Sequence, residues 1–306
     1  TFILQGDANV STMVPSRNHT LRLAYDRYMR YLIMGSAFLL TVIIFAIIVF
    51  VGQQGLMTFS EVSPIDFFFS AKWDPTENKF GAFSFILGTV TTTLLAILLG
   101  APLGLAGAIF MAKIAPPTLR DIMRPATDLY VAIPSVVYGF IGLTVIVPFI
   151  RTYFGVSTGF GLLASSVILA IMILPTIISV SEDAIKSVPK PLEEGSLALG
   201  ATRWQTITNV ILPAAMPGIL TSIILAMARA VGETMAVQMV IGNTPQVAWS
   251  LFKPTATLTS EIVVEMGNTP FGSAWGNSLF LMALVLLLLS LAMILVIRRV
   301  AARRFA

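Results

Sequence analysis

The chain has 306 residues, of which 56% are hydrophobic and 11% charged, with a formal net charge of +4 at pH 7. Soluble globular domains carry about 25% charged residues, so this composition excludes a water-soluble surface and indicates burial in lipid. Cysteine is absent and His19 is the single histidine, which excludes disulfides and a histidine metal centre. We expect no resident cofactor or metal.

Long uncharged apolar segments follow one another along the chain. A helix needs about 20 residues, at 1.5 Å each, to cross the hydrocarbon core of a bilayer. The segments of that length are 31–51, one within 81–112, 129–150, one within 158–180, 213–240 and 276–297. We therefore predict an all-α, polytopic membrane bundle of six transmembrane helices. The connecting segments 53–80 and 243–275 are long enough to hold short helices.

The distribution of Lys and Arg predicts the orientation. With both termini in the cytoplasm, the inner segments hold fourteen basic residues and the outer segments hold only four. Such an excess follows the positive-inside rule. We predict a multi-pass protein of the cytoplasmic (inner) membrane, with cytoplasmic tails at residues 1–30 and 301–306 and a transmembrane domain at residues 31–300.

Within the second segment, Gly100 and Gly104 form a GxxxG pair, which lets two helix backbones approach closely. We expect both glycines to serve helix packing. Small residues are also simply common in membrane helices, and that reading stays open.

The segment 187–213 between the fourth and fifth spans predicts two short helices on the cytoplasmic face. Pro189 and Pro191 can begin a helix, and Gly200 can end it. Thr202 and Gln205 then form a capping box for a second helix. The first helix carries two acidic residues in its first turn, Glu193 and Glu194. It also carries a short apolar stripe, formed by Leu192, Ser196 and Leu199 with Leu197 beside them.

The spacing within this loop resembles that of ABC importer permeases. Their loop reads E-A-A, three residues, G, nine residues and I-x-L-P, and here 194–196, Gly200 and 210–213 lie at the same spacing. Gly195 and Ser196 replace the two alanines, and Val210 replaces isoleucine. The resemblance implies a helix that couples the chain to an ATPase, through Leu192, Glu193, Glu194, Gly195, Ser196, Leu197 and Gly200. The alternative is an ordinary amphipathic surface helix.

Two further segments narrow the resemblance. Residues 132–139 read AIPSVVYG, and residues 228–237 read ARAVGETMAV. Together they are similar to the PstC-type permeases of phosphate transport systems, over about residues 20–300. The sister PstA-type permeases usually continue Gly-Glu-Thr with Ala-Pro, whereas Met235 follows here.

This resemblance implies the rest of the assembly. Its members would be a second, PstA-like permease, two copies of an ATPase subunit and an extracytoplasmic phosphate-binding protein, with no nucleic acid. The chain has no Gly-Lys dipeptide and hence no P-loop, so ATP would be bound by the partner ATPase and this chain would not be an enzyme. Open alternatives are transport of molybdate, tungstate or sulfate, and an ion-coupled secondary carrier.

Two charges fall inside the fifth span. Arg229 and Glu233 are four residues apart, which would place them on one face of a continuous helix where they could meet. Charges within the membrane usually mark a pathway or a buried pair. We expect Arg229 to bind the passing anion and Glu233 to hold Arg229 in place. The alternative is a purely structural ion pair between the two residues. Hydroxyl groups of Thr234, Ser135 and Tyr138 would add neutral hydrogen bonds.

Overall fold

The computed structural model describes the backbone of residues 17–305 and the side chains of residues 25–299. The side chain of His19, most of the tail predicted at residues 1–30 and the side chains of the tail at 301–306 lie outside these described parts. The chain divides into two compact units, residues 1–50 and residues 51–306. The first unit contributes most of α1 (Arg17–Leu56), whose large apolar side chains are exposed from Tyr25 to Phe50, as in a helix that faces lipid.

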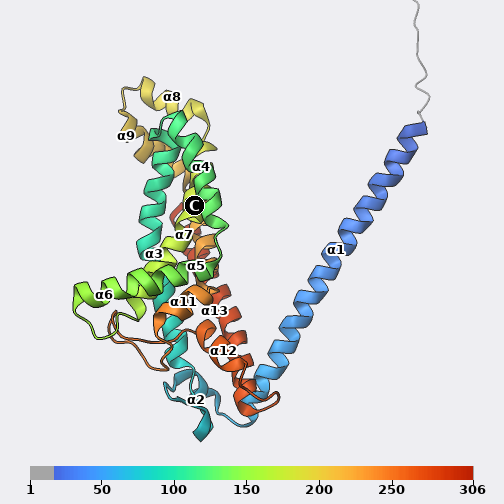
Figure 1. The fold of residues 1–306 in the computed structure, drawn as a ribbon. Helices are drawn as coiled ribbons and strands as arrows, with labels where there is room; N and C mark the ends of the chain where they lie inside the picture. Colours follow the sequence, from blue (N-terminus) through green and yellow to red (C-terminus); the bar gives the residue numbers. More distant parts are fainter. Residues whose placement is uncertain (1–16, 306) are drawn as a thin grey trace, which may run out of the picture. The chain divides into compact units, whose positions relative to one another are not determined.

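The second unit is almost entirely helical (Figure 1). After α1 its helices and strands are, in chain order, η1 (Met57–Ser60), α2 (Pro64–Phe69), β1 (Trp73–Asp74), η2 (Pro75–Glu77), β2 (Lys79–Phe80), α3 (Phe83–Ile109), η3 (Phe110–Ile114), α4 (Pro117–Val131), α5 (Ser135–Ile141), η4 (Gly142–Ile146), α6 (Val147–Phe154), α7 (Leu162–Lys186), α8 (Lys190–Ala198), α9 (Arg203–Thr206), η5 (Ile207–Ile211), α10 (Leu212–Val231), α11 (Met235–Ile241), α12 (Leu258–Met266) and α13 (Ala274–Phe305).

Six helical segments of the described chain are long and apolar enough to cross a membrane, which confirms the predicted fold class. They are Tyr25–Ser60, Phe83–Ile114, Ser135–Phe154, Leu162–Lys186, Arg203–Val231 and Ala274–Arg299. The two long connections do hold short helices, α2 and α12. The first of them also forms a hairpin in which β1 pairs with β2 antiparallel, with Trp73 opposite Phe80.

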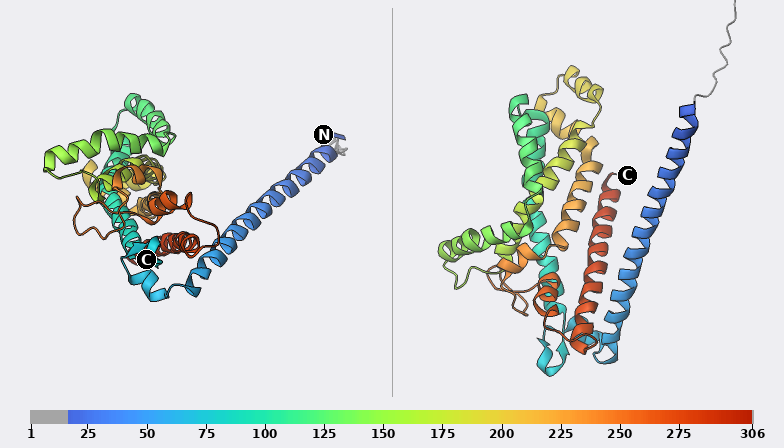
Figure 2. Two further views of the ribbon diagram at one scale, coloured as in Figure 1. Left: turned by 60° about the horizontal axis from the view of Figure 1, so that its bottom comes forward. Right: turned by 45° about the vertical axis from the view of Figure 1, so that its right-hand side comes forward.

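The centre of the second unit is the packing of α3 against α7 and of α7 against α10 (Figures 1 and 2). Gly100 and Gly104 are both buried on the side of α3 that faces α7. A Cβ atom on Gly104 would lie 2.6 Å from Ile177 Cγ2, and one on Gly100 would lie 3.1 Å from Ile173 Cδ1. The missing side chains therefore let the two helices approach closely.

Two of the predicted spans are interrupted, which corrects their predicted bounds. The segment 129–150 is not one helix, because α4 ends at Val131 and α5 begins at Ser135. Pro134 lacks a backbone N–H and disfavours a helical conformation at Ile133. The segment 213–240 likewise breaks, since α10 ends at Val231 and α11 begins only at Met235.

Candidate functional site

The break between α10 and α11 separates the two charges of the fifth span. Arg229 lies in the last turn of α10, where a cation is favoured by the helix dipole. Glu233 lies beyond the helix end, and its Oε1 accepts a hydrogen bond from the backbone N–H of Ala236 at 3.2 Å. No ion pair joins the two side chains, both of which the structure describes. The expected pairing on one helix face is wrong, because the helix ends between them.

The three hydroxyl side chains expected near this break have different surroundings. Thr234 and Ser135 are half-buried, and Thr234 makes only a long bond of 3.4 Å to the carbonyl of Gly232. Tyr138 is buried, and its hydroxyl donates to the backbone carbonyl of Tyr130 at 2.7 Å. This hydrogen bond bridges the break between α4 and α5.

The helix pair α8–α9 forms at one end of the second unit, as the loop pattern predicts (Figure 1). Pro189 is the residue before α8, and Gly200 adopts a positive φ of 84°, which ends the helix at little cost for glycine. The capping box of Thr202 and Gln205 is confirmed: the Thr202 hydroxyl accepts from Gln205 N, and the Gln205 side chain accepts from Thr202 N.

An ion pair fixes α8 against the end of the α3 helix. Lys113 Nζ, in the π-helical turn η3, lies 2.6 Å from Glu193 Oε2. Ser196 hydrogen-bonds Thr206 across the hairpin at 3.0 Å, so α8 and α9 are also joined to each other. A cleft of about 550 Å³ opens beside this ion pair, and Trp204 lines it.

The outer face of the hairpin is apolar and accessible. Leu192 is 48% exposed, Leu197 is 41% exposed and Leu199 is 91% exposed. Glu194 and Gly195 are exposed on the same helix. Large exposed apolar side chains on a polar helix mark a surface suited to binding another protein.

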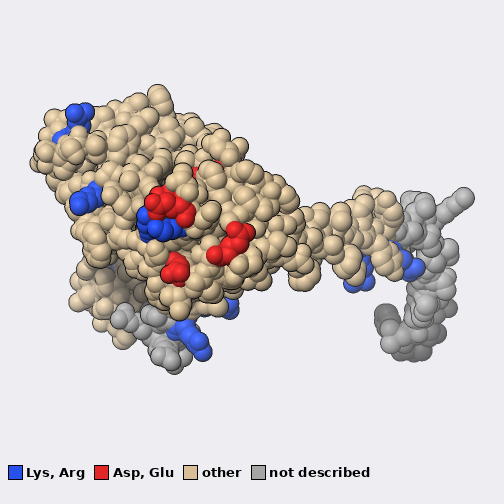
Figure 3. All heavy atoms as spheres, turned by 90° about the horizontal axis from the view of Figure 1, so that it is seen from below, with Lys and Arg blue, Asp and Glu red and all other residues tan. Residues whose placement is uncertain are grey.

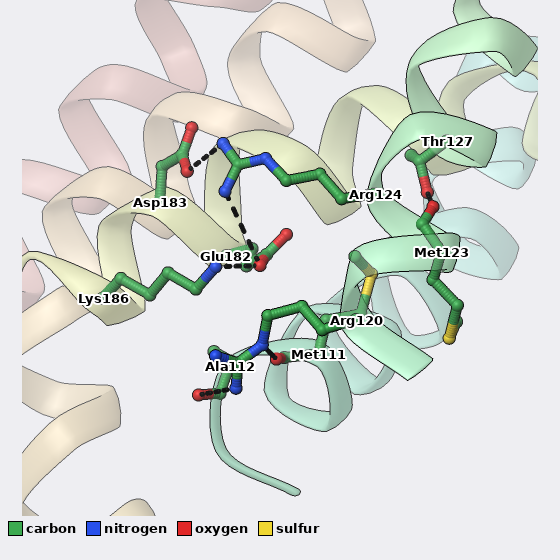
Figure 4. A network of polar contacts seen from close by, with 9 residues as sticks. All are labelled: Met111, Ala112, Arg120, Met123, Arg124, Thr127, Glu182, Asp183 and Lys186. Carbon is green, nitrogen blue, oxygen red and sulfur yellow. Dashed lines mark hydrogen bonds and ion pairs between the residues drawn. The ribbon is translucent and has the colours of Figure 1, made fainter. Parts of the chain in front are cut away.

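A second group of charges lies on α4 and α7 (Figure 4). The carboxylate of Glu182 is 1% exposed and contacts both Lys186 Nζ and, at 3.9 Å, Arg124 Nη1. Arg124 Nη2 also pairs with the exposed Asp183 at 3.0 Å. No local pattern in the sequence signals this group, because Arg124 on α4 and Asp183 on α7 are 59 residues apart.

The opposite end of the second unit carries small groups of acidic and basic side chains on a mostly uncharged surface (Figure 3). Here Glu265, on α12, accepts hydrogen bonds from two indoles: Trp73 Nε1 lies 3.0 Å from both carboxylate oxygens, and Trp275 Nε1 lies 2.7 Å from Oε2. Glu261, one turn earlier, is 4% exposed. Burial and the neighbouring Glu265 raise the pKa of Glu261 to about 8. Sequence reasoning missed these carboxylates, although their spacing of four residues was visible.

Comparison with known proteins identifies the family. The family described as binding-protein-dependent transport system inner membrane component matches residues 100–306. The chain belongs to this family. It is 50% identical over 279 residues to the "Probable ABC transporter permease protein YqgH" of Bacillus subtilis, covering 90% of each chain. It is 37% identical to the phosphate transport system permease protein PstC of Mesorhizobium japonicum, covering 83% of this chain and 82% of that protein.

Solved structures of ABC importers share the fold of this permease. The chain aligns with a subunit of an importer of the polysaccharide alginate at a TM-score of 0.59 and 19% identity, covering 92% of this chain and 99% of the other. It aligns with a subunit of the inward-facing MetNI methionine transporter at a TM-score of 0.53 and 22% identity, covering 72% and 93%. The predicted resemblance to importer permeases, with PstC-type relatives, is thus confirmed, and the chain is a multi-pass membrane transport component.

Proposed function

We propose that this permease carries inorganic phosphate across the cytoplasmic membrane as one of two channel-forming subunits of an ATP-driven importer. The observation that supports an anion is Arg229, a membrane-embedded cation at the α10–α11 break that makes no ion pair within the described part of the chain. Relatives of this chain include permeases named for phosphate transport.

The chemistry of Arg229 suits transient binding of an oxyanion. A guanidinium offers parallel N–H donors that match two oxygens of phosphate, and it keeps its charge in the membrane. Conduction also requires that the anion leave easily. Glu233, which lies within the break, would limit the affinity by its negative charge, while Thr234 and Ser135 would offer neutral hydroxyl donors. In this proposal Tyr138 stabilises the neighbouring break rather than donating to the anion.

The energy source in this proposal is a separate ATPase. Two copies of that subunit would bind the coupling helix of this chain and of a PstA-like second permease, and ATP would bind there. The exposed Leu192 and Leu197 of α8 and Leu199, directly after it, form the proposed docking surface, with Glu193, Glu194, Gly195, Ser196 and Gly200 shaping it. An extracytoplasmic phosphate-binding protein would deliver the substrate to the other end.

The proposed orientation places the α8–α9 end and both termini in the cytoplasm. Basic residues gather on the elements of that end, which is the side that the positive-inside rule assigns to the cytoplasm. They are Lys113, Arg120, Arg124, Lys186, Lys190 and Arg203.

The test is uptake of labelled phosphate by vesicles that contain the purified complex, with ATP inside and the binding protein outside. Replacing Arg229 by glutamine should abolish uptake while the complex still assembles. The matched control is Arg151→Gln, since Arg151 is an exposed cation of α6 and should be dispensable. Normal uptake by the Arg229→Gln complex would contradict the proposed role of the guanidinium.

The same vesicles separate the alternatives. Excess molybdate, tungstate or sulfate should leave phosphate uptake unchanged if phosphate is the substrate, whereas uptake of one of these ions instead would reassign the substrate. Uptake driven by an ion gradient, with no ATPase present, would favour a secondary carrier.

A further inference from the structure

Helix α12 connects the α10–α11 break with the opposite end of the second unit. Its first turn contacts the break through Thr259, whose hydroxyl donates to the backbone carbonyl of Glu233 at 3.0 Å. Its last turn carries Glu265, which accepts the indole N–H groups of Trp73 in β1 and Trp275 in α13. One short helix therefore touches both the proposed anion path and the surface elements of this end.

The bond from Thr259 stabilises a carbonyl that α10 and α11 leave without a helical partner. Glu233 lies after the end of α10 and before the start of α11, so its carbonyl can receive no hydrogen bond from the ladder of α10. A carbonyl shielded from water is costly without a donor, and at this partly buried position Thr259, at 6% exposed, provides the donor. The side chain of one helix thus sets the position of a residue 26 positions earlier.

The hydroxyl of Thr259 is itself fixed by a rigid helix start. Thr257 Oγ1 lies 3.0 Å from Thr259 Oγ1 and accepts from the backbone N–H of Ser260. The backbone N–H of Leu258 donates to Thr89 Oγ1 of α3 at 3.0 Å. Because α3 belongs to the packed centre of the unit, the start of α12 cannot shift freely, and neither can the carbonyl that it holds.

We infer that Thr259 is a positioning residue for anion translocation, which sets the α10–α11 break and so the placement of Glu233 relative to Arg229. This role rests on the proposed function. Through the indole bonds of Glu265, the same helix transmits the arrangement of the β1–β2 hairpin and of α13 to the break. Thr259 does not touch the anion; it acts through the backbone of Glu233.

The test compares Thr259→Val with Thr259→Ser in the reconstituted complex. Valine keeps the shape of the side chain but removes the hydroxyl, whereas serine keeps the hydroxyl. The measured quantity is phosphate transported per ATP hydrolysed with binding protein present. Loss of one neutral hydrogen bond changes an equilibrium constant by a factor of about two to ten. We expect Thr259→Val to lower the ratio by that factor and Thr259→Ser to restore it.

This ratio separates positioning from folding. A variant that merely folds less well lowers uptake and ATP hydrolysis together and leaves the ratio unchanged. The matched control is Thr144→Val, because Thr144 is exposed on η4 and bonds only the carbonyl of Phe140 in its own helix. An unchanged ratio in Thr259→Val, or a serine variant as impaired as the valine variant, would overturn the inference.

A double substitution tests whether Thr259 acts through Glu233. If it does, the effect of Thr259→Val should shrink when Glu233→Gln is already present, whereas independent roles would give multiplicative effects and contradict the inference. Failure of the unsubstituted complex to take up phosphate would instead overturn the proposed function, and this role with it.

Discussion

Lys113 and Glu193 join α8 to the α3 helix through an ion pair of 2.6 Å, a direct side-chain link between the hairpin and the packed centre of the unit. Lys113 is 17% exposed and Glu193 is 35% exposed, so the pair is partly shielded from water. In the proposed function α8 receives the motion of the ATPase, and the pair would pass that motion to α3 and its neighbour α7.

We therefore predict that Lys113→Met and Glu193→Gln each uncouple ATP hydrolysis from uptake. Partly exposed ion pairs contribute about 0.2–1 kcal/mol, so the complex should still assemble and keep its thermal stability within a few degrees. The exchanged double variant, Lys113→Glu with Glu193→Lys, should recover part of the coupling. Equal phosphate-to-ATP ratios in wild type and both single variants would rule out this link.

Because α3 and α7 approach closely, we predict that a single methyl group added at Gly104 destabilises the complex. A Cβ atom at Gly104 would lie 2.6 Å from Cγ2 and 2.8 Å from Cβ of Ile177, which cannot move without its backbone. Overpacking of this kind costs about 1–3 kcal/mol. Gly104→Ala should accordingly lower the unfolding midpoint of the complex in detergent.

The control for that substitution is Gly195→Ala on α8. No atom lies within 4 Å of a Cβ built at Gly195, and alanine in a helix is favoured over glycine by about 0.5–1 kcal/mol. This variant should be as stable as wild type or slightly more so. A lower midpoint for Gly195→Ala than for Gly104→Ala would contradict the packing argument.

The two acidic residues of α7, Glu182 and Asp183, should contribute differently to stability because one is buried and the other is exposed. Glu182 is 1% exposed and faces two cations, whereas the side chain of Asp183 is 60% exposed. Removing one partner of a buried polar contact lowers the free energy of unfolding by about 1–3 kcal/mol. An exposed ion pair contributes at most about 1 kcal/mol to it. Urea or thermal unfolding should therefore show a clear loss for Glu182→Gln and almost none for Asp183→Asn.

The buried Glu261 predicts a pH dependence of stability. Burial and the charge of Glu265 raise its pKa from 4.5 to about 8 in the folded chain, while the two indoles near Glu265 are neutral. The folded protein thus retains a proton that the unfolded chain releases. The free energy of unfolding should be highest below pH 4.5, as far as this group contributes, and should fall as the pH rises to about 8.

Unfolding midpoints measured from pH 5 to pH 9 would check this dependence. Glu261→Gln keeps the size of the side chain and cannot ionise, so it should flatten the fall in stability over this range. Glu77→Gln is the control: Glu77 is exposed, and Lys72 and Lys79 hold its pKa at about 2, below the range of the measurement. A slope that persists unchanged in Glu261→Gln would assign it to another group.

The sequence by itself determined the membrane class, the number of spans and the α8–α9 hairpin. These features depend on residues that are neighbours in the chain. Apolar length decides whether a helix crosses the bilayer, and the capping box of Thr202 and Gln205 needs a spacing of only three residues. The positive φ at Gly200 also follows from the local preference of glycine.

Only the tertiary structure decided where the spans break and which distant groups meet. An apolar segment is compatible with a continuous helix or with an interrupted one, so hydropathy did not reveal that α10 ends at Val231 and separates Arg229 from Glu233. Lys113 and Glu193 are 80 residues apart, and Trp73 and Glu265 are 192 apart. Such contacts depend on how whole helices pack, which no local pattern of residues encodes.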